Sequence, residues 1–258
     1  MFSIPIEPLL VGILVMIRVA MFFAFMPVFG DIFVPIRVRM LLALAVTIII
    51  APLLFDVSLM FPTTVAGFVT MMLPEALLGM AFGLVGRIAF GIVQFGGNVI
   101  GEQVGFHMAQ TVDPSQGQQV PVMAQTFFIS ALLVFFSING HHIFFRALAL
   151  SFEEAPPGHL GFSFQLHDFF REQGARMFEI AVQLALPIIA VVFMINAAMG
   201  MLAKAVPQIQ VFFESFILRI VLGLFVISMI FGFLVRKMLE IFSYLQPDLE
   251  NLILLLRP

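Results

Sequence analysis

Six long apolar stretches run along the chain, and polar segments separate them. The stretches cover approximately residues 8–29, 38–55, 65–100, 122–138, 177–203 and 209–235. A helix needs about 20 apolar residues to cross the hydrocarbon core of a bilayer, and the second and fourth stretches are shorter than that. Proline, which removes a helical hydrogen bond, interrupts or ends most stretches, at Pro27, Pro52, Pro74 and Pro187. The pattern predicts an all-α membrane protein with kinked or broken helices.

Two polar segments are longer than a turn. Residues 102–121 contain amide side chains, the pair Asp113-Pro114 and no lysine or arginine, which is typical of a loop with a turn. Residues 139–176 contain histidines, charged residues and Pro156-Pro157. We predict that this second segment is a solvent-facing connection with one short amphipathic piece at residues 163–178.

The composition excludes a soluble protein. Of 258 residues, 62% are hydrophobic and 10% are charged, and the mean hydropathy is +1.13; soluble domains have roughly 45–50% apolar and 25% charged residues. The 12 basic and 15 acidic residues are scattered, so there is no electrostatic footprint for nucleic acid. The chain has no cysteine, which excludes disulfides and thiolate sites. We expect one integral membrane body.

The aromatic residues are unusual, with 33 Phe, one Tyr and no Trp. Membrane proteins usually place Trp and Tyr at both bilayer interfaces, where Phe lacks the polar group that such an anchor needs. Two interpretations stay open: much of the apolar surface contacts other proteins, or the composition has drifted.

The basic residues do not give a simple topology. Arg37 and Arg39 place the first loop in the cytoplasm, and Arg236 and Lys237 place the C-terminus there too. Five apolar stretches lie between these two points, and an odd number of crossings would put them on opposite sides. Either one stretch is a hairpin or a re-entrant segment, or the chain does not cross a bilayer in the ordinary way.

Charged residues also occur within the apolar stretches. A charge near the bilayer centre costs about 2.5–3.5 kcal/mol on insertion scales, so such residues usually face a partner or a watery cavity. The alternative for any one of them is a side chain that extends to the interface from near a helix end. We predict buried charges at Arg18, Glu75, Arg87, Glu179, Glu214 and Arg219.

Glycines in the third stretch repeat at every fourth position, which places them on one helix face and lets another backbone approach closely. The helix-packing positions that we predict are Gly79, Gly83, Gly97 and Gly101, with Gly105 continuing the second series.

Catalytic, metal and cofactor sites are not predicted. His141, His142, His159, Glu153 and Glu154 supply ligand types but no metal-binding spacing, and the alternative is a polar loop at a helix end. An intramembrane protease would need a serine nucleophile elbow or a pair of aspartates within the membrane, and the sequence has neither pattern. A secondary transporter would use broken helices and buried acids such as Glu75 or Glu179, but the repeated halves expected of one are not visible.

Short motifs across nearly the whole chain resemble the flagellar biosynthesis protein family FliR, which is homologous to the SctT proteins of virulence type III secretion. In order, they are Pro35-Ile36-Arg37-Val38-Arg39, Gly86-Arg87, Gly101-Glu102-Gln103-Val104-Gly105-Phe106, Asp113-Pro114, Asn139-Gly140-His141, Ser151-Phe152 with Pro156-Pro157-Gly158, Leu186-Pro187, and Pro207-Gln208. The chain departs from the family after Pro207-Gln208, where it has Gln210 and then Glu214-Ser215-Phe216-Ile217 in place of an Asn and a Gly-Phe-Pro turn.

The resemblance implies a non-enzymatic subunit of the export gate in the bacterial inner membrane, at the flagellar basal body. It implies a FliP-like part at residues 1–175 joined to a FliQ-like helical hairpin at 176–258, within a helical multi-subunit assembly. The implied partners are FliP, FliQ, FlhB, FlhA, membrane lipids and unfolded export substrates; the alternatives are a virulence-type SctT subunit or a secondary transporter.

In the family, the loop that matches residues 105–121 resembles a plug in the closed pore. The loop here is polar, lacks basic residues and has flanking glycines, as a displaceable segment requires. An ordinary interhelical turn is the alternative. The plug residues that the resemblance implies are Gly105, Phe106, His107, Met108, Gln110, Asp113, Pro114 and Gln118.

Overall fold

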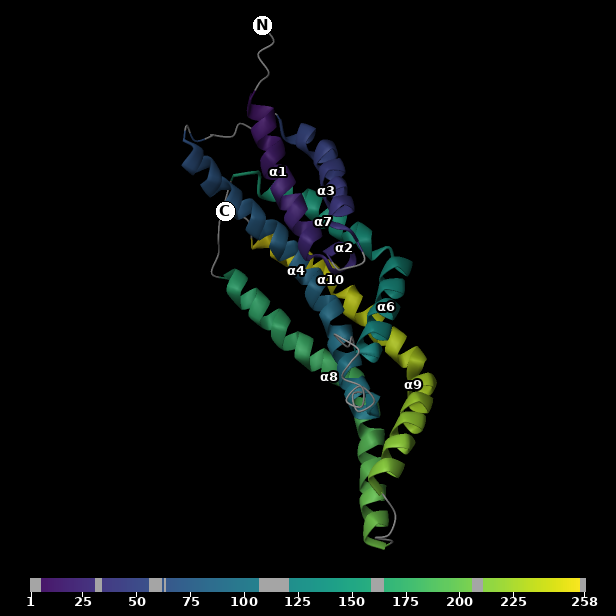
Figure 1. Cartoon of the computed structure of the whole chain (residues 1–258). Helices are drawn as coiled ribbons and strands as arrows, with labels where there is room; N and C mark the ends of the chain where they lie inside the picture. Colours follow the sequence, from purple (N-terminus) through teal and green to yellow (C-terminus); the bar gives the residue numbers. More distant parts are fainter. Residues whose placement is uncertain are drawn as a thin grey trace. The chain divides into compact units, whose positions relative to one another are not determined.

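The structure is a computed structural model, and it describes residues 6–30, 34–55, 62, 64–106, 121–158, 165–205 and 211–255. Within these ranges the regular structure is helical and contains no strand. The helices are α1 (Ile6–Phe25), α2 (Pro27–Gly30), α3 (Ile36–Ile50), η1 (Ala51–Leu54), α4 (Val65–Val104), α6 (Val122–Ser137), α7 (Gly140–Glu154), α8 (Gln165–Ala205), α9 (Val211–Ser243) and α10 (Leu245–Leu254) (Figure 1).

Five helical segments are long and apolar enough to cross a membrane, which confirms the prediction of an all-α membrane protein. They are Glu7–Phe25, Ile36–Leu54, Val65–Val104, Gln165–Ala205 and Glu214–Leu254. Helix α6 is too short alone and qualifies only together with α7, as a broken span or a re-entrant segment. The stretch at 122–138 therefore does not cross as a straight helix by itself. It is the candidate for the re-entrant segment that the distribution of basic residues predicted.

Proline breaks the helices less often than the sequence suggests. Pro27 begins α2 and Pro52 lies in η1, but Pro74 and Pro187 lie inside α4 and α8, which continue past them. We predicted kinked or broken helices, and at these two prolines the helix is not broken, which leaves a kink as the predicted outcome there. An interior proline costs about 3 kcal/mol, and tertiary packing of neighbours such as buried Leu184 and Ile188 outweighs this cost.

The segment at residues 139–176 is not the open connection that we predicted. It contains helix α7, whose residues Phe144, Leu148 and Phe152 are almost completely buried. These residues are four apart and therefore share one face, whereas His142 and Arg146 lie on the exposed side. The amphipathic piece at 163–178 is the beginning of the 41-residue helix α8 and not a separate element.

The chain divides into two compact units, each with its own core. Unit 1 comprises Met1–Ile88, Asn139–Gln173 and Tyr244–Pro258, and unit 2 comprises Ala89–Ile138 and Gly174–Ser243. In unit 1, α3 packs against α1, and α10 packs against α7. In unit 2, Phe90 lies with its ring centroid 5.7 Å from that of Phe128, 5.2 Å from Phe135 and 5.0 Å from Phe242.

The regularly spaced glycines of α4 face helices of the same chain. In unit 1, a Cβ atom on Gly79 would overlap the Arg18 carbonyl oxygen of α1, and one on Gly83 would lie 2.6 Å from Cβ of Phe25. In unit 2, a Cβ atom on Gly97 would lie 2.8 Å from Cβ of Phe127 in α6, and one on Gly101 would lie 3.0 Å from Cβ of Met123. Each glycine series therefore permits close packing of one neighbouring helix.

Candidate functional site

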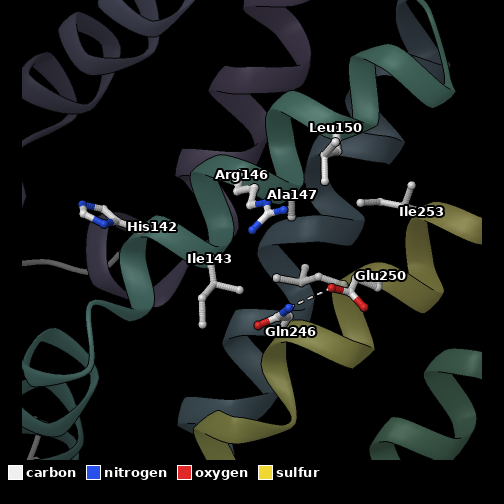
Figure 2. A pocket seen from close by; sticks show the side chains of 9 residues that line it. His142, Ile143, Arg146, Ala147, Leu150, Gln246, Glu250 and Ile253 are labelled. Carbon is white, nitrogen blue, oxygen red and sulfur yellow. Dashed lines mark hydrogen bonds between the residues drawn. The ribbon is translucent and has the colours of Figure 1, made fainter.

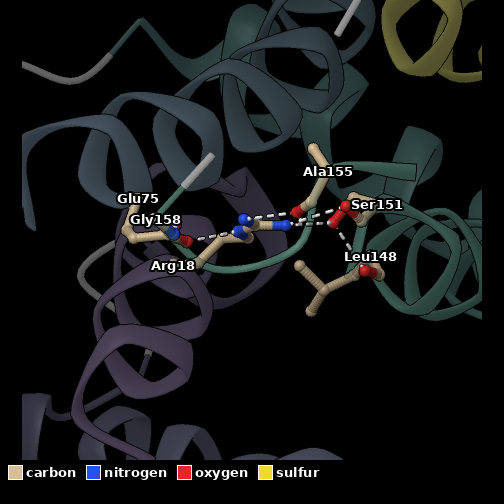
Figure 3. A network of polar contacts seen from close by, with 6 residues as sticks. All are labelled: Arg18, Glu75, Leu148, Ser151, Ala155 and Gly158. Carbon is tan, nitrogen blue, oxygen red and sulfur yellow. Dashed lines mark hydrogen bonds and ion pairs between the residues drawn. The ribbon is translucent and has the colours of Figure 1, made fainter. Parts of the chain in front are cut away.

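Helix α7 makes two kinds of contact within unit 1. On one side it packs against α10, and a pocket of about 190 Å³ lies between the two helices (Figure 2). On the other side, its C-terminal turn contacts a buried ion pair (Figure 3).

The ion pair joins Arg18 of α1 to Glu75 of α4, 57 positions apart in the sequence. The Nε atom of Arg18 donates to the Oε2 atom of Glu75 at 2.7 Å, and both side chains are completely buried. The second carboxylate oxygen of Glu75, Oε1, accepts from the backbone N–H of Gly158 at 2.9 Å. Both oxygens of this carboxylate therefore have a hydrogen-bond donor.

The remaining nitrogens of Arg18 bind the end of α7. Its Nη1 atom donates to the carbonyl oxygen of Ser151 at 2.9 Å and to the Ser151 hydroxyl at 3.2 Å, and its Nη2 atom donates to the carbonyl oxygen of Ala155 at 2.9 Å. The guanidinium also lies 4.2 Å from the ring centroid of Phe152. Because the carbonyl end of a helix carries partial negative charge, Arg18 acts as a cationic cap for α7.

Two backbone features complete the network. Gly158 has a φ of +82°, a conformation that favours glycine, and this turn directs its N–H toward Glu75. The Ser151 hydroxyl donates to the carbonyl oxygen of Leu148 at 2.7 Å, which holds the serine in the same cluster. The network thus ties α1, α4 and the α7 end together, with hydrogen-bond partners for every nitrogen of the guanidinium.

This arrangement suits a structural joint better than a reactive site. A buried charged pair is tolerated when its geometry is good and the other lone pairs and protons are satisfied, as they are here. A proton or ion relay needs access to water, but both side chains are fully buried. Among the described residues, no group of three metal-ligating side chains lies close enough together to hold a metal ion.

The other charges of the apolar stretches differ from this pair. Arg87, Glu179 and Glu214 are exposed in the chain, and Arg219 is half-buried. Within the single chain, Arg18 and Glu75 are the buried members of the predicted set, and burial of the other charges against a partner stays a prediction. In α8 no charged residue lies between Glu179 and Lys204, and in α9 none lies between Arg219 and Arg236. Glu179 and Arg219 thus mark the first ends of these apolar segments, where a long side chain can extend to a membrane interface.

Of the predicted plug loop, only Gly105, Phe106 and the last residue, Pro121, belong to the described residues. Gly105 follows α4 with a φ of +98°, and a Cβ atom on it would lie 3.2 Å from the Phe216 ring. Phe106 is half-buried. The other predicted loop residues, His107, Met108, Gln110, Asp113, Pro114 and Gln118, lie outside the described residues.

Sequence reasoning missed the partners that α7 contributes to the network. Ser151, Ala155 and Gly158 take part mainly through backbone atoms, for which side-chain patterns give little signal. The sequence did contain two indirect signals: Asn139-Gly140, where Asn139 adopts a left-handed conformation before α7, and Pro156-Pro157-Gly158, where the chain turns after it.

Known proteins resemble this chain over most of its length. The family model described as bacterial export proteins, family 1, matches residues 9–245. The flagellar biosynthetic protein FliR of Bacillus subtilis (strain 168) is 29% identical over 250 residues, which cover 94% of each protein. FliR of Escherichia coli (strain K12) is 30% identical over 213 residues, covering 81% of this chain and 79% of the relative. FliR of Caulobacter vibrioides is 28% identical over 245 residues, covering 90% and 96%.

The joint can be tested by removing one charge and then both. We expect Arg18→Met to destabilise the protein by about 3–5 kcal/mol, because it leaves the Glu75 carboxylate buried without its counter-charge. The double variant Arg18→Met with Glu75→Met removes both charges and should cost less than the single variant. Circular dichroism monitors the thermal unfolding of each purified protein in mild detergent. The unfolding temperatures of the wild type, the single variant and the double variant are then compared.

The matched control is Lys237→Met in α9. Lys237 forms a partly exposed ion pair with Glu240 at 2.9 Å, and exposed pairs contribute about 0–1 kcal/mol. If Arg18→Met lowered the unfolding temperature no more than Lys237→Met does, the buried pair would not hold unit 1 together.

Proposed function

This chain belongs to family 1 of the bacterial export proteins, the FliR family, and we propose that it forms the flagellar export pore together with FliP and FliQ. It is a component of the flagellar export apparatus and a membrane protein. In this proposal it is a non-enzymatic subunit of the type III secretion gate, located in the inner membrane at the flagellar basal body. Unfolded flagellar proteins pass through the pore, and FlhB and FlhA are further partners.

Similarity to flagellar FliR proteins along nearly the whole chain is the observation that carries the proposal. It favours the flagellar system over a virulence-type SctT subunit. Exposed apolar surface supports assembly: only 11% of the most apolar window of Glu214–Leu254 is buried within the chain, against 61% for Val65–Val104. Lipid or neighbouring subunits must cover the rest, because such a surface is not stable in water.

The buried ion pair argues against the alternative of a secondary transporter. Glu75 would be the natural acidic residue for coupling to protons or ions, but Arg18 and Gly158 occupy both of its oxygens. The charge pair is thus committed to holding helices together. A gate subunit, in contrast, requires rigid helices that present surfaces to neighbours and needs no ion relay.

The division into a FliP-like part at residues 1–175 and a FliQ-like part at 176–258 stays a prediction. The boundary falls inside helix α8, which is continuous from Gln165 to Ala205. The FliQ-like part in this proposal contains the remainder of α8, helix α9 and helix α10 (Leu245–Leu254). Its two long helices would present their apolar surfaces to other subunits of the gate.

Deletion of the gene tests the proposed function. We expect loss of flagellar hook and filament proteins from the culture medium, with restoration by the wild-type gene on a plasmid, because the pore cannot form without this subunit. Immunoblots of medium and cells measure the secreted fraction. Normal secretion in the deletion strain would refute the proposal, and so would loss of uptake of a single small solute with secretion intact.

The loop at residues 105–121 is proposed to obstruct the closed pore. A segment that is polar and free of basic residues can be displaced from between apolar helices at low cost, which a movable barrier requires. A shift of only about 1.4 kcal/mol between the closed and open states changes their ratio tenfold. Removing favourable contacts of the loop should therefore be enough to open the pore.

Replacing Met108 to Gln118 by a short Gly-Ser bridge tests this role. We expect higher ion conductance than wild type in lipid bilayers, measured on complexes whose subunit content has first been verified by native mass spectrometry. A control variant keeps the length of the loop but shuffles residues 108–118. Wild-type conductance after deletion, in a verified complex, would place the barrier elsewhere, such as at Met or Phe side chains that exclude water from a constriction.

A further inference from the structure

The pocket between α7 and α10 has no part in the buried ion-pair network. We call it the α7–α10 pocket; it has a volume of about 190 Å³ and is lined by His142, Ile143, Arg146, Ala147, Leu150, Gln246, Leu249, Glu250 and Ile253 (Figure 2). All nine residues belong to unit 1. The export function proposed above does not require such a pocket, so its chemistry is a separate question.

Opposite charges face this space from its two helices. Arg146 projects from α7, and Glu250 lies across from it on α10, next to Gln246 (Figure 2). The amide of Gln246 donates to Glu250 at 2.9 Å, whereas Arg146 makes no hydrogen bond or ion pair with any described residue. The cation and the anion thus flank the same pocket without pairing with each other.

The position of Arg146 favours a bound anion. His142 lies one helical turn before it, so its ring provides a further hydrogen-bond donor on the same face. His142 is also in the first turn of α7, where the helix dipole favours negative charge. A phosphate group is the anion that an arginine fork binds well.

The rest of the lining is apolar. Ala147, Leu249 and Ile253 are buried and form the base of the pocket, while Ile143 and Leu150 are half-buried. Leu254, directly after the pocket residue Ile253, is 54% exposed. An apolar part of a ligand could therefore extend from the pocket along these apolar side chains.

We propose that the α7–α10 pocket binds a phospholipid with a phosphoethanolamine headgroup. The phosphate contacts Arg146 and His142, the ammonium group contacts Glu250, and the acyl chains lie along Leu150 and the apolar end of α10. The pocket carries one cation, Arg146, and one anion, Glu250, which matches the paired opposite charges of a zwitterionic headgroup. Glu250 distinguishes this headgroup from a purely anionic one, because a carboxylate attracts ammonium and repels additional negative charge.

Arg146→Gln tests the phosphate contact. The full chain, purified in mild detergent with its co-purifying proteins, is mixed with phosphatidylethanolamine, and native mass spectrometry counts the lipids retained. We expect about tenfold or greater loss of affinity in Arg146→Gln, because charge-assisted hydrogen bonds to phosphate are lost. The matched control is Lys204→Gln, which removes one exposed positive charge from α8 outside the pocket. Equal retention by the two variants would overturn the proposal.

Glu250→Gln tests the ammonium contact. We expect the wild-type protein to prefer phosphatidylethanolamine over phosphatidylglycerol and the variant to lose this preference. Glu153→Gln is the matched control, because Glu153 is an exposed carboxylate near the end of α7 that does not line the pocket. A wild-type protein without the preference, or an unchanged preference in Glu250→Gln, would show that Glu250 does not select the headgroup.

A second measurement does not depend on mass spectrometry. The chain has no tryptophan, so Leu150→Trp places its single tryptophan at the pocket, where excitation at a tryptophan-selective wavelength avoids Tyr244. Phosphatidylethanolamine with brominated acyl chains should quench it, and Arg146→Gln in the same background should reduce the quenching. If Arg146→Gln instead released a co-purifying protein and left quenching and lipid retention unchanged, the pocket would be a protein interface and the lipid proposal would be wrong.

Discussion

A charged pair sealed inside an apolar protein is the interaction on which unit 1 depends. Arg18 and Glu75 are tolerated there because each polar nitrogen and oxygen has a partner, and those partners come from α1, α4 and the end of α7. Moving any one of these helices would leave a charge buried without compensation. The pair therefore specifies one arrangement of helices, which nonspecific apolar contacts alone would not do. The close approach of α4 to α1 at Gly79 and Gly83 brings the two charges within reach.

Unit 2 relies on a different kind of packing. Its core is made by aromatic rings around Phe90 and by the approach of α6 to Gly97 and Gly101, and much of α9 is exposed. A chain with one rigidly specified unit and long uncovered helices is suited to a subunit that completes its packing in a membrane assembly. The exposed apolar residues and the many phenylalanines have the same explanation in this account, because phenylalanine packs well against protein without an interfacial polar group.

The sequence predicted the long helices well, since apolar composition over 15 or more residues is a strong signal. The stretches at 65–100 and 122–138 correspond to α4 (Val65–Val104) and α6 (Val122–Ser137). Helix α7 was missed because its polar face, with His142 and Arg146, hid the periodic positions Phe144, Leu148 and Phe152. Arg18 and Glu75 could be singled out as charges in apolar stretches, but their pairing is a tertiary contact that sequence spacing does not reveal. Arg87, Glu179 and Glu214 are also charges in apolar stretches, yet they are exposed in the chain, so the sequence pattern alone does not distinguish paired charges from exposed ones.

We propose that this FliR-family chain works as a subunit of a larger membrane complex. The most direct measurement is the mass of the particle that carries an affinity-tagged chain, solubilised from its own cells in mild detergent and measured by light scattering with mass spectrometry of its components. We expect a particle with a mass well above the 28.7 kDa of the chain, and we expect it to contain other flagellar export proteins. A well-folded, monodisperse particle that contains this 28.7 kDa chain as its one polypeptide would contradict it.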